Sequence, residues 1–303
     1  MPSGSVKNTS RRAGATFFVL LAALLPSCNS STGLAALPVL VAPVDGVRTT
    51  SDSPTFSIRN AQGYDGKGAT YTFRAAVAKT DQELATVTVP AGSGTTTARF
   101  ERPLPRGALL AWRVTGRTAG SSEVVSDSAT FRLPAVVCLS GQTPWAKSVV
   151  EWWLPSCSLE HNRYNSPQET LGEPNASQDA PGGPYHGFMS LGDGGHVTVD
   201  MGGCAVDGAG DDVRVYQSVS QEPVTLYASG TAEGPYVLVE SRKVCGARMP
   251  GVFSRVCSFD LGQAGLEEAR YLRVEDGELF PCPGGTDSEG ADIDAVEILN
   301  AKP

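Results

Sequence analysis

Leu109-Leu-Ala-Trp-Arg-Val114 has the pattern of a β-strand, because the large apolar residues Leu110, Trp112 and Val114 occur at every second position. Such a two-residue period is typical of a β-strand, because successive side chains of a strand point to opposite faces. Similar stretches recur between clusters of Gly, Asp, Asn and Pro, at 54–58, 71–77, 85–89, 95–100 and 128–133. Several short strands over about 100 residues, without a helical run, predict a β-sandwich over residues 37–134.

The composition supports an all-β protein. The 303 residues include 34 glycines and 21 prolines, and only 18% are charged, which excludes a helical bundle or coiled coil. The length predicts about two domains. A net charge of −8 argues against a nucleic-acid partner, because such a protein carries a basic face.

Residues 37–134 resemble the fibronectin type III modules of bacterial proteins. The motifs that carry this resemblance are Pro43-Val-Asp-Gly46, Tyr71-x-Phe73, Leu104-Pro-x-Gly107, Leu110-x-Trp112-Arg-Val114 and Ser126-x-Ser128-x-x-Phe131. All of them are framework positions, so the resemblance implies a spacer or docking module without its own chemistry. We expect Trp112 and Phe131 in the core of this domain.

Residues 1–27 are predicted to be a signal peptide. Lys7, Arg11 and Arg12 precede the apolar run 13–25, which is too short to span a membrane. Leu25-Pro-Ser-Cys28 resembles the bacterial lipobox, which implies a lipid on the Cys28 thiol, a membrane partner and a tether over residues 28–36. Asn29 favours the outer membrane and the cell surface. The alternative is an ordinary signal peptide with no role for Cys28.

The other six cysteines lie beyond residue 134, and they are Cys138, Cys157, Cys204, Cys245, Cys257 and Cys282. An even number in an exported domain predicts three disulfides. Cys245 and Cys257 flank a turn containing Gly and Pro and are the first expected pair, followed by Cys138–Cys157. A zinc site is not expected, because there is no Cys-x-x-Cys spacing and no close Cys/His pair.

Residues 135–303 form the second predicted domain, with 10 basic and 24 acidic residues. Their motifs, in order, are Leu171-Gly-x-Pro174, Phe188-x-Ser-Leu-Gly-x-Gly-Gly195, Asp211-Asp-Val-Arg-Val215 and Asp292-Ile-Asp-Ala-Val296. Residues 165–300 thereby resemble a module of bacterial "cell surface protein" sequences and jelly-roll sandwiches of the discoidin and galactose-binding type. The resemblance implies a second, disulfide-rich and acidic, jelly-roll-like β-sandwich. Tyr216-Gln217 and the six cysteines depart from the pattern.

The aspartates of this domain are candidate calcium ligands. Alternation predicts that Asp211 shares the buried face with Val213 and Val215, and that Asp292 and Asp294 share one face about 7 Å apart. Two such carboxylates repel unless a cation lies between them, and Ca²⁺ prefers oxygen ligands. The predicted set is Asp211, Asp212, Asp276, Asp287, Asp292 and Asp294. The alternative is a solvated acidic edge, or carboxylates that cap backbone amides.

No catalytic residues are predicted. The chain lacks G-x-S-x-G, H-E-x-x-H and P-loop motifs, and it has only three histidines. We therefore expect a non-enzymatic surface lipoprotein with a binding, adhesion or structural role, whose partner is a surface glycan or another surface protein. The alternative is an accessory carbohydrate-binding protein that stacks sugars on Trp145, Trp152, Trp153, Tyr164 and Tyr185, unless these rings pack under the disulfides. A hydrolase of unrecognised type is the third possibility.

Overall fold

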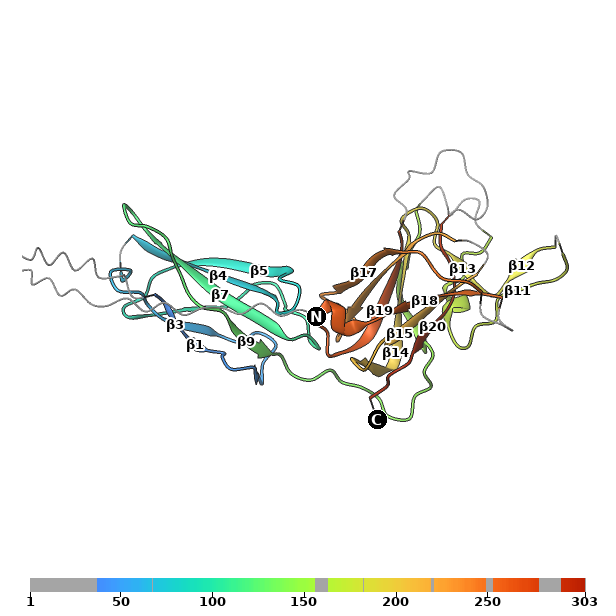
Figure 1. The fold of residues 1–303 in the computed structure, drawn as a ribbon, viewed down its shortest axis with the longest axis horizontal. Helices are drawn as coiled ribbons and strands as arrows, with labels where there is room; N and C mark the ends of the chain where they lie inside the picture. Colours follow the sequence, from blue (N-terminus) through green and yellow to red (C-terminus); the bar gives the residue numbers. More distant parts are fainter. Residues whose placement is uncertain are drawn as a thin grey trace, which may run out of the picture. The chain divides into compact units, whose positions relative to one another are not determined.

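The computed structural model describes residues 37–66, 68–155, 163–181, 183–218, 221–248, 253–277 and 290–302. These residues belong to one compact unit. Their strands build an all-β fold of two sandwiches (Figure 1). No helix within the described ranges has the length and hydropathy needed to cross a membrane. The predicted signal peptide and tether, Cys28, Cys157, Cys282 and Asp287 lie outside the described residues.

The first sandwich has a small and a large sheet. The small sheet has the order β1-β3-β6, formed by β1 (Val39–Ala42), β3 (Phe56–Arg59) and β6 (Thr95–Ala98). The large sheet has the order β2-β9-β7-β4-β5, with β8 also on β7; its strands are β2 (Val47–Arg48), β4 (Ala69–Val77), β5 (Glu83–Pro90), β7 (Leu110–Thr118), β8 (Val124–Val125) and β9 (Ala129–Arg132).

The alternating residues 110–114 lie on β7, at the middle of the large sheet. Leu110, Trp112 and Val114 are buried, as the sequence pattern predicts. The Trp112 ring packs edge-on against Phe56 at 5.0 Å and stacks on Phe73 at 6.0 Å. Its Nε1 donates a hydrogen bond of 2.6 Å to the Pro43 carbonyl. Trp112 is therefore a core residue that joins the two sheets.

The second sandwich also has two main sheets. The five-stranded sheet has the order β10-β14-β19-β16-β17, formed by β10 (Ser148–Trp153), β14 (His196–Val206), β19 (Glu268–Asp276), β16 (Val224–Ser229) and β17 (Val237–Lys243). The four-stranded sheet has the order β13-β20-β15-β18, formed by β13 (Met189–Ser190), β20 (Asp292–Ile298), β15 (Val213–Gln217) and β18 (Arg255–Phe259). The ribbon β11 (Ser177–Gln178) with β12 (Tyr185–His186), and the 3-10 helices η1 (Pro167–Thr170) and η2 (Leu261–Ala264), complete it.

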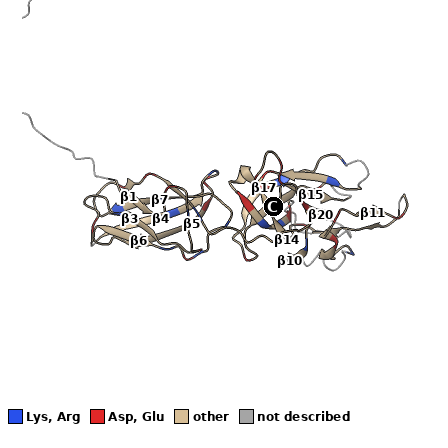
Figure 2. Cartoon of the chain, turned by 90° about the horizontal axis from the view of Figure 1, so that it is seen from below, with Lys and Arg blue, Asp and Glu red and all other residues tan. Residues whose placement is uncertain are grey.

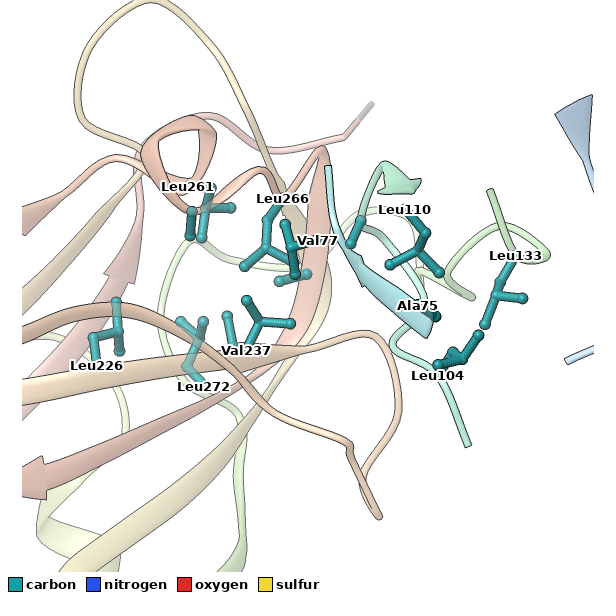
Figure 3. Close-up of a cluster of buried hydrophobic side chains, with 14 of the residues drawn as sticks. Ala75, Val77, Leu104, Leu110, Leu133, Leu226, Val237, Leu261, Leu266 and Leu272 are labelled. Carbon is teal, nitrogen blue, oxygen red and sulfur yellow. The ribbon is translucent and has the colours of Figure 1, made fainter. Parts of the chain in front are cut away.

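The two sandwiches contact each other through the segment that leads into β19. The Gly107 carbonyl accepts hydrogen bonds from the amides of Glu267 at 2.6 Å and Glu268 at 3.1 Å. A side chain at position 107 would place its Cβ 1.9 Å from the Glu268 carbonyl oxygen, so this approach requires glycine. Val77 and Leu266 lie in the buried cluster at this contact (Figure 3). Backbone pairing and apolar packing together join the sandwiches.

The disulfides confirm one predicted pair and correct another. Cys245 is bonded to Cys257, as expected from their position around a turn. Cys138 is bonded to Cys204 rather than to Cys157. The segment before β10 runs beside β14, where the Leu139 amide donates to the Gly202 carbonyl at 2.9 Å. Strand pairing therefore brings together two cysteines that are 66 residues apart, which sequence proximity does not predict.

The burial of the acidic strands differs partly from the sequence prediction. Val213 and Val215 are buried as expected, but Asp211 is exposed and Asp212 takes the buried position. On β20, Asp292 and Asp294 are buried at 2% and 1% exposure. Residues on both faces of β20 are buried, so neither face of this strand is open to water at Asp292 and Asp294. The alternative of a solvated acidic edge is therefore wrong for these two residues.

Candidate functional site on the outer face of the five-stranded sheet

The predicted aromatic residues do not share one stacking surface. Four of them contact four different rings: Trp145 packs against Tyr216 at 5.7 Å, Trp153 against His196 at 6.2 Å, Tyr164 against Phe188 at 4.6 Å, and Tyr185 against Phe253 at 5.8 Å. Trp152 and Trp153 are the exposed tryptophans of the described chain, at 41% and 51%. They are neighbours on the edge strand β10, and adjacent residues of a strand point to opposite faces.

Three of the predicted metal ligands accept backbone hydrogen bonds. The Asp294 carboxylate accepts from the amides of Asn175 at 2.8 Å and Ala176 at 3.2 Å, and from the Ser254 hydroxyl. Asp276 accepts from the amides of Gly194 and Ala291, and Asp212 from those of Gly208 and Leu261. Each carboxylate thus ties a loop to the end of a strand. This geometry supports amide capping as their role.

One carboxylate cluster combines a predicted residue with two that the sequence analysis missed. Asp207, Asp212 and Asp260 each offer an oxygen, and these oxygens lie within 4.8 Å of one another. Burial, then the charges of Asp212 and Asp260, raise the pKa of Asp207. Asp212 is fully engaged by amides and by the Asn300 side chain. No sequence spacing links these three residues, because the turn before β15 meets the N-terminus of η2 only in the fold.

The strongest candidate for a functional site is the outer face of the five-stranded sheet. The inner face is apolar, since Val197 and Val199 of β14 pair with Val274 and Leu272 of β19, and all four are buried. The alternate residues of these strands lie on the opposite face. The residues of this face are called the sheet-face site here, and they are Glu151, Trp153, His196, Thr198, Tyr227, Tyr271, Arg273 and Glu275.

Strand register arranges the sheet-face site in rows across the sheet. In one row Glu151, Thr198, Arg273 and Tyr227 lie opposite one another on β10, β14, β19 and β16. In the next row Trp153, His196 and Glu275 do the same. Neighbouring strands are about 4.8 Å apart, so each row is a continuous line of polar or aromatic side chains.

Arg273 is the centre of this face. Its Nη2 forms an ion pair of 2.6 Å with Glu151, and its Nε donates to the Thr198 hydroxyl at 3.0 Å. The guanidinium also lies over the Tyr236 ring, 4.6 Å from the ring centroid. Arginine is suited to such a position, because its planar group stacks on a ring while its edges donate hydrogen bonds.

Several ionisable groups on or beside this face are neutral at physiological pH or held in ion pairs. Burial raises the pKa of Tyr236 to about 12, so this phenol stays neutral at physiological pH. Burial, then Arg273, lowers the pKa of His196, so the imidazole is also neutral there. Glu151 is paired with Arg273, and Asp200 is paired with Arg270 at 2.8 Å. Basic and acidic residues are interspersed along the strands (Figure 2).

Of these residues, only Trp153 is among the candidates predicted from the sequence. Glu151 and Arg273 are 122 residues apart in the chain and meet through the pairing of β10, β14 and β19. The order of these strands in the sheet is not written in any local motif. The signal that the sequence does contain is the polar alternation in Tyr271-Leu-Arg-Val-Glu275, which marks one outward-facing side of β19.

Comparison with known proteins gives no family for this chain. No protein-family model and no curated protein matches it. Among solved structures, a SusE-like protein is 9% identical with a TM-score of 0.29, over 86% of this chain and 96% of that one. An allantoicase is 7% identical with a TM-score of 0.30, over 83% and 78%. Neither likeness assigns a function. Fold and site define an all-β protein of two sandwiches with a polar, aromatic sheet face.

Proposed function

We propose that this chain is a non-enzymatic binding protein of the bacterial cell surface, and that the sheet-face site is its binding surface. The observation that supports the proposal is the partly exposed network around Arg273, in which Glu151, Thr198 and Tyr236 are fixed around one guanidinium. Side chains held in this way lose little freedom when a ligand binds, which favours affinity.

A binding role accounts for the site better than a catalytic one. Glu151 is held in an ion pair with Arg273, so its carboxylate is placed to accept hydrogen bonds rather than to transfer a proton. Trp153 is 51% exposed at the edge of the same face, where it offers a flat apolar surface. In this proposal the first sandwich is a spacer that carries the second away from the membrane.

Calcium remains a prediction for the acidic loops of the second sandwich. Asp212, Asp276 and Asp294 accept amide hydrogen bonds that satisfy their carboxylates without a cation. We therefore assign these three residues to loop capping, and the proposed binding surface does not depend on a metal ion.

Surface anchoring rests on Cys28 and is tested by Cys28→Ser. Wild type is expected to enter the detergent phase on phase partitioning and to carry a diacylglyceryl mass on Cys28, whereas the variant remains in the aqueous phase. Protease treatment of intact cells should digest the wild-type protein. Aqueous partitioning of the wild type, or protection of the chain in intact cells, would contradict the surface role.

A further inference from the structure

We infer that the sheet-face site binds an uncharged polysaccharide, with a sugar ring stacked on Trp153 and hydroxyls bound by the Glu151–Arg273 pair. The inference rests on the proposed function, and it adds the chemical class of the ligand and the residues that recognise it. It is supported by the combination, on one sheet face, of the exposed indole of Trp153 and an ion pair whose Glu151 is exposed and whose Arg273 is partly exposed.

The positions of these groups suit a sugar. Glu151 and Trp153 are two residues apart on β10, so they share a face at a spacing of about 7 Å. The aliphatic face of a sugar ring packs on an indole, while its hydroxyls accept from a guanidinium and donate to a carboxylate. Arg273 and Glu151 are both held before a ligand arrives, which gives these hydrogen bonds a fixed geometry.

The charges favour a neutral ligand. The arginine of the sheet-face site, Arg273, is paired with Glu151, so it is not left as an isolated positive charge. The second sandwich belongs to a segment with 10 basic and 24 acidic residues, whose field repels polyanions. A polyanion therefore gains no charge complementarity here, whereas a neutral chain gains stacking and hydrogen bonds.

The extent of the face favours a chain over a small molecule. The row that begins at Glu151 on β10 passes through Thr198 and Arg273 to Tyr227 on β16, over four adjacent strands. Strands about 4.8 Å apart give a platform of about 15 Å across these positions. A partly exposed platform of this width contacts several consecutive sugars, each weakly, which suits the display of a binding protein on a surface.

Affinity electrophoresis tests the inference with defined probes. Full-length protein, purified in a polyoxyethylene detergent that carries no sugar, is run in native gels containing hydroxyethylcellulose, galactomannan, xyloglucan or, as the acidic probe, polygalacturonate. The wild type is expected to be retarded by at least one neutral polysaccharide and not by polygalacturonate. Trp153→Ala should weaken this binding at least about tenfold, and Glu151→Gln should weaken it severalfold.

Trp152→Ala is the matched control, because Trp152 is adjacent, similarly exposed and on the opposite face of β10. It is expected to bind as wild type, and unchanged melting temperatures establish that all variants are folded. The inference is overturned if no neutral gel retards the wild type, if polygalacturonate retards it more strongly, or if Trp152→Ala and Trp153→Ala lose binding equally. The Cys28→Ser test of surface anchoring does not depend on these binding results. Surface anchoring and polysaccharide binding can therefore be contradicted independently of each other.

Discussion

Asp294→Ala is expected to lower the free energy of unfolding by about 3 kcal/mol, because it leaves three donors without their acceptor. These donors are the amides of Asn175 and Ala176 and the hydroxyl of Ser254. Asp294 is 1% exposed, so water does not replace the lost acceptor. Urea unfolding of the variant and the wild type measures the difference.

Asp294→Asn is the matched control for this prediction. Its side-chain oxygen keeps the two amide hydrogen bonds, and its nitrogen can donate to the Ser254 oxygen. Burial raises the pKa of Asp294, which means that the fold disfavours the charged carboxylate, so a neutral amide is tolerated. We expect the Asn variant to unfold within about 1 kcal/mol of the wild type at neutral pH.

EDTA and added Ca²⁺ distinguish amide capping by Asp294 from calcium binding. If Asp294 caps amides, neither EDTA nor added Ca²⁺ changes the difference in stability between the wild type and Asp294→Asn. If Asp294 holds a calcium ion, EDTA lowers the melting temperature of the wild type, and the Asn variant loses this dependence. The second outcome would contradict the assignment of Asp294 to loop capping.

Trp112→Ala is expected to lower the free energy of unfolding of the first sandwich by about 3–5 kcal/mol. The side chain is 1% exposed and contacts Phe56 of the small sheet and Phe73 of the large sheet. Truncation leaves a cavity between the sheets that these strands cannot close. Urea unfolding followed by circular dichroism measures the loss.

Trp112→Phe separates packing from hydrogen bonding at this position. The phenyl ring keeps much of the contact with Phe56 and Phe73 but removes the Nε1 donor to the Pro43 carbonyl. A loss of about 1–2 kcal/mol is expected, clearly smaller than that of the alanine variant. Equal losses for the two variants would show that the hydrogen bond, and not ring packing, holds the sheets together.

The strands could be predicted where one face is buried and the other is not. The alternation in Leu110, Trp112 and Val114 follows directly from the position of β7 in a two-layer sandwich. It gave the all-β class and the core role of Trp112. On β20 the same reasoning failed in part, because a strand covered on both faces hides its polar residues as well as its apolar ones.

The candidate site could not be predicted, because it depends on which strands become neighbours. Cys138 and Cys204 pair, and Glu151 and Arg273 meet, because β10 lies beside β14 and β14 beside β19. Nothing local in the chain specifies this order. Aromatic content alone pointed to five residues, of which only Trp153 lies on the sheet-face site.

We propose that the outer face of the five-stranded sheet is the binding surface of this protein. The most direct test is the mobility of Trp153→Ala beside Trp152→Ala in one native gel that contains a neutral polysaccharide. We expect Trp152→Ala to be retarded like the wild type, and Trp153→Ala to be retarded much less, as expected for binding weakened at least about tenfold. Retardation of Trp153→Ala equal to that of the wild type would contradict it.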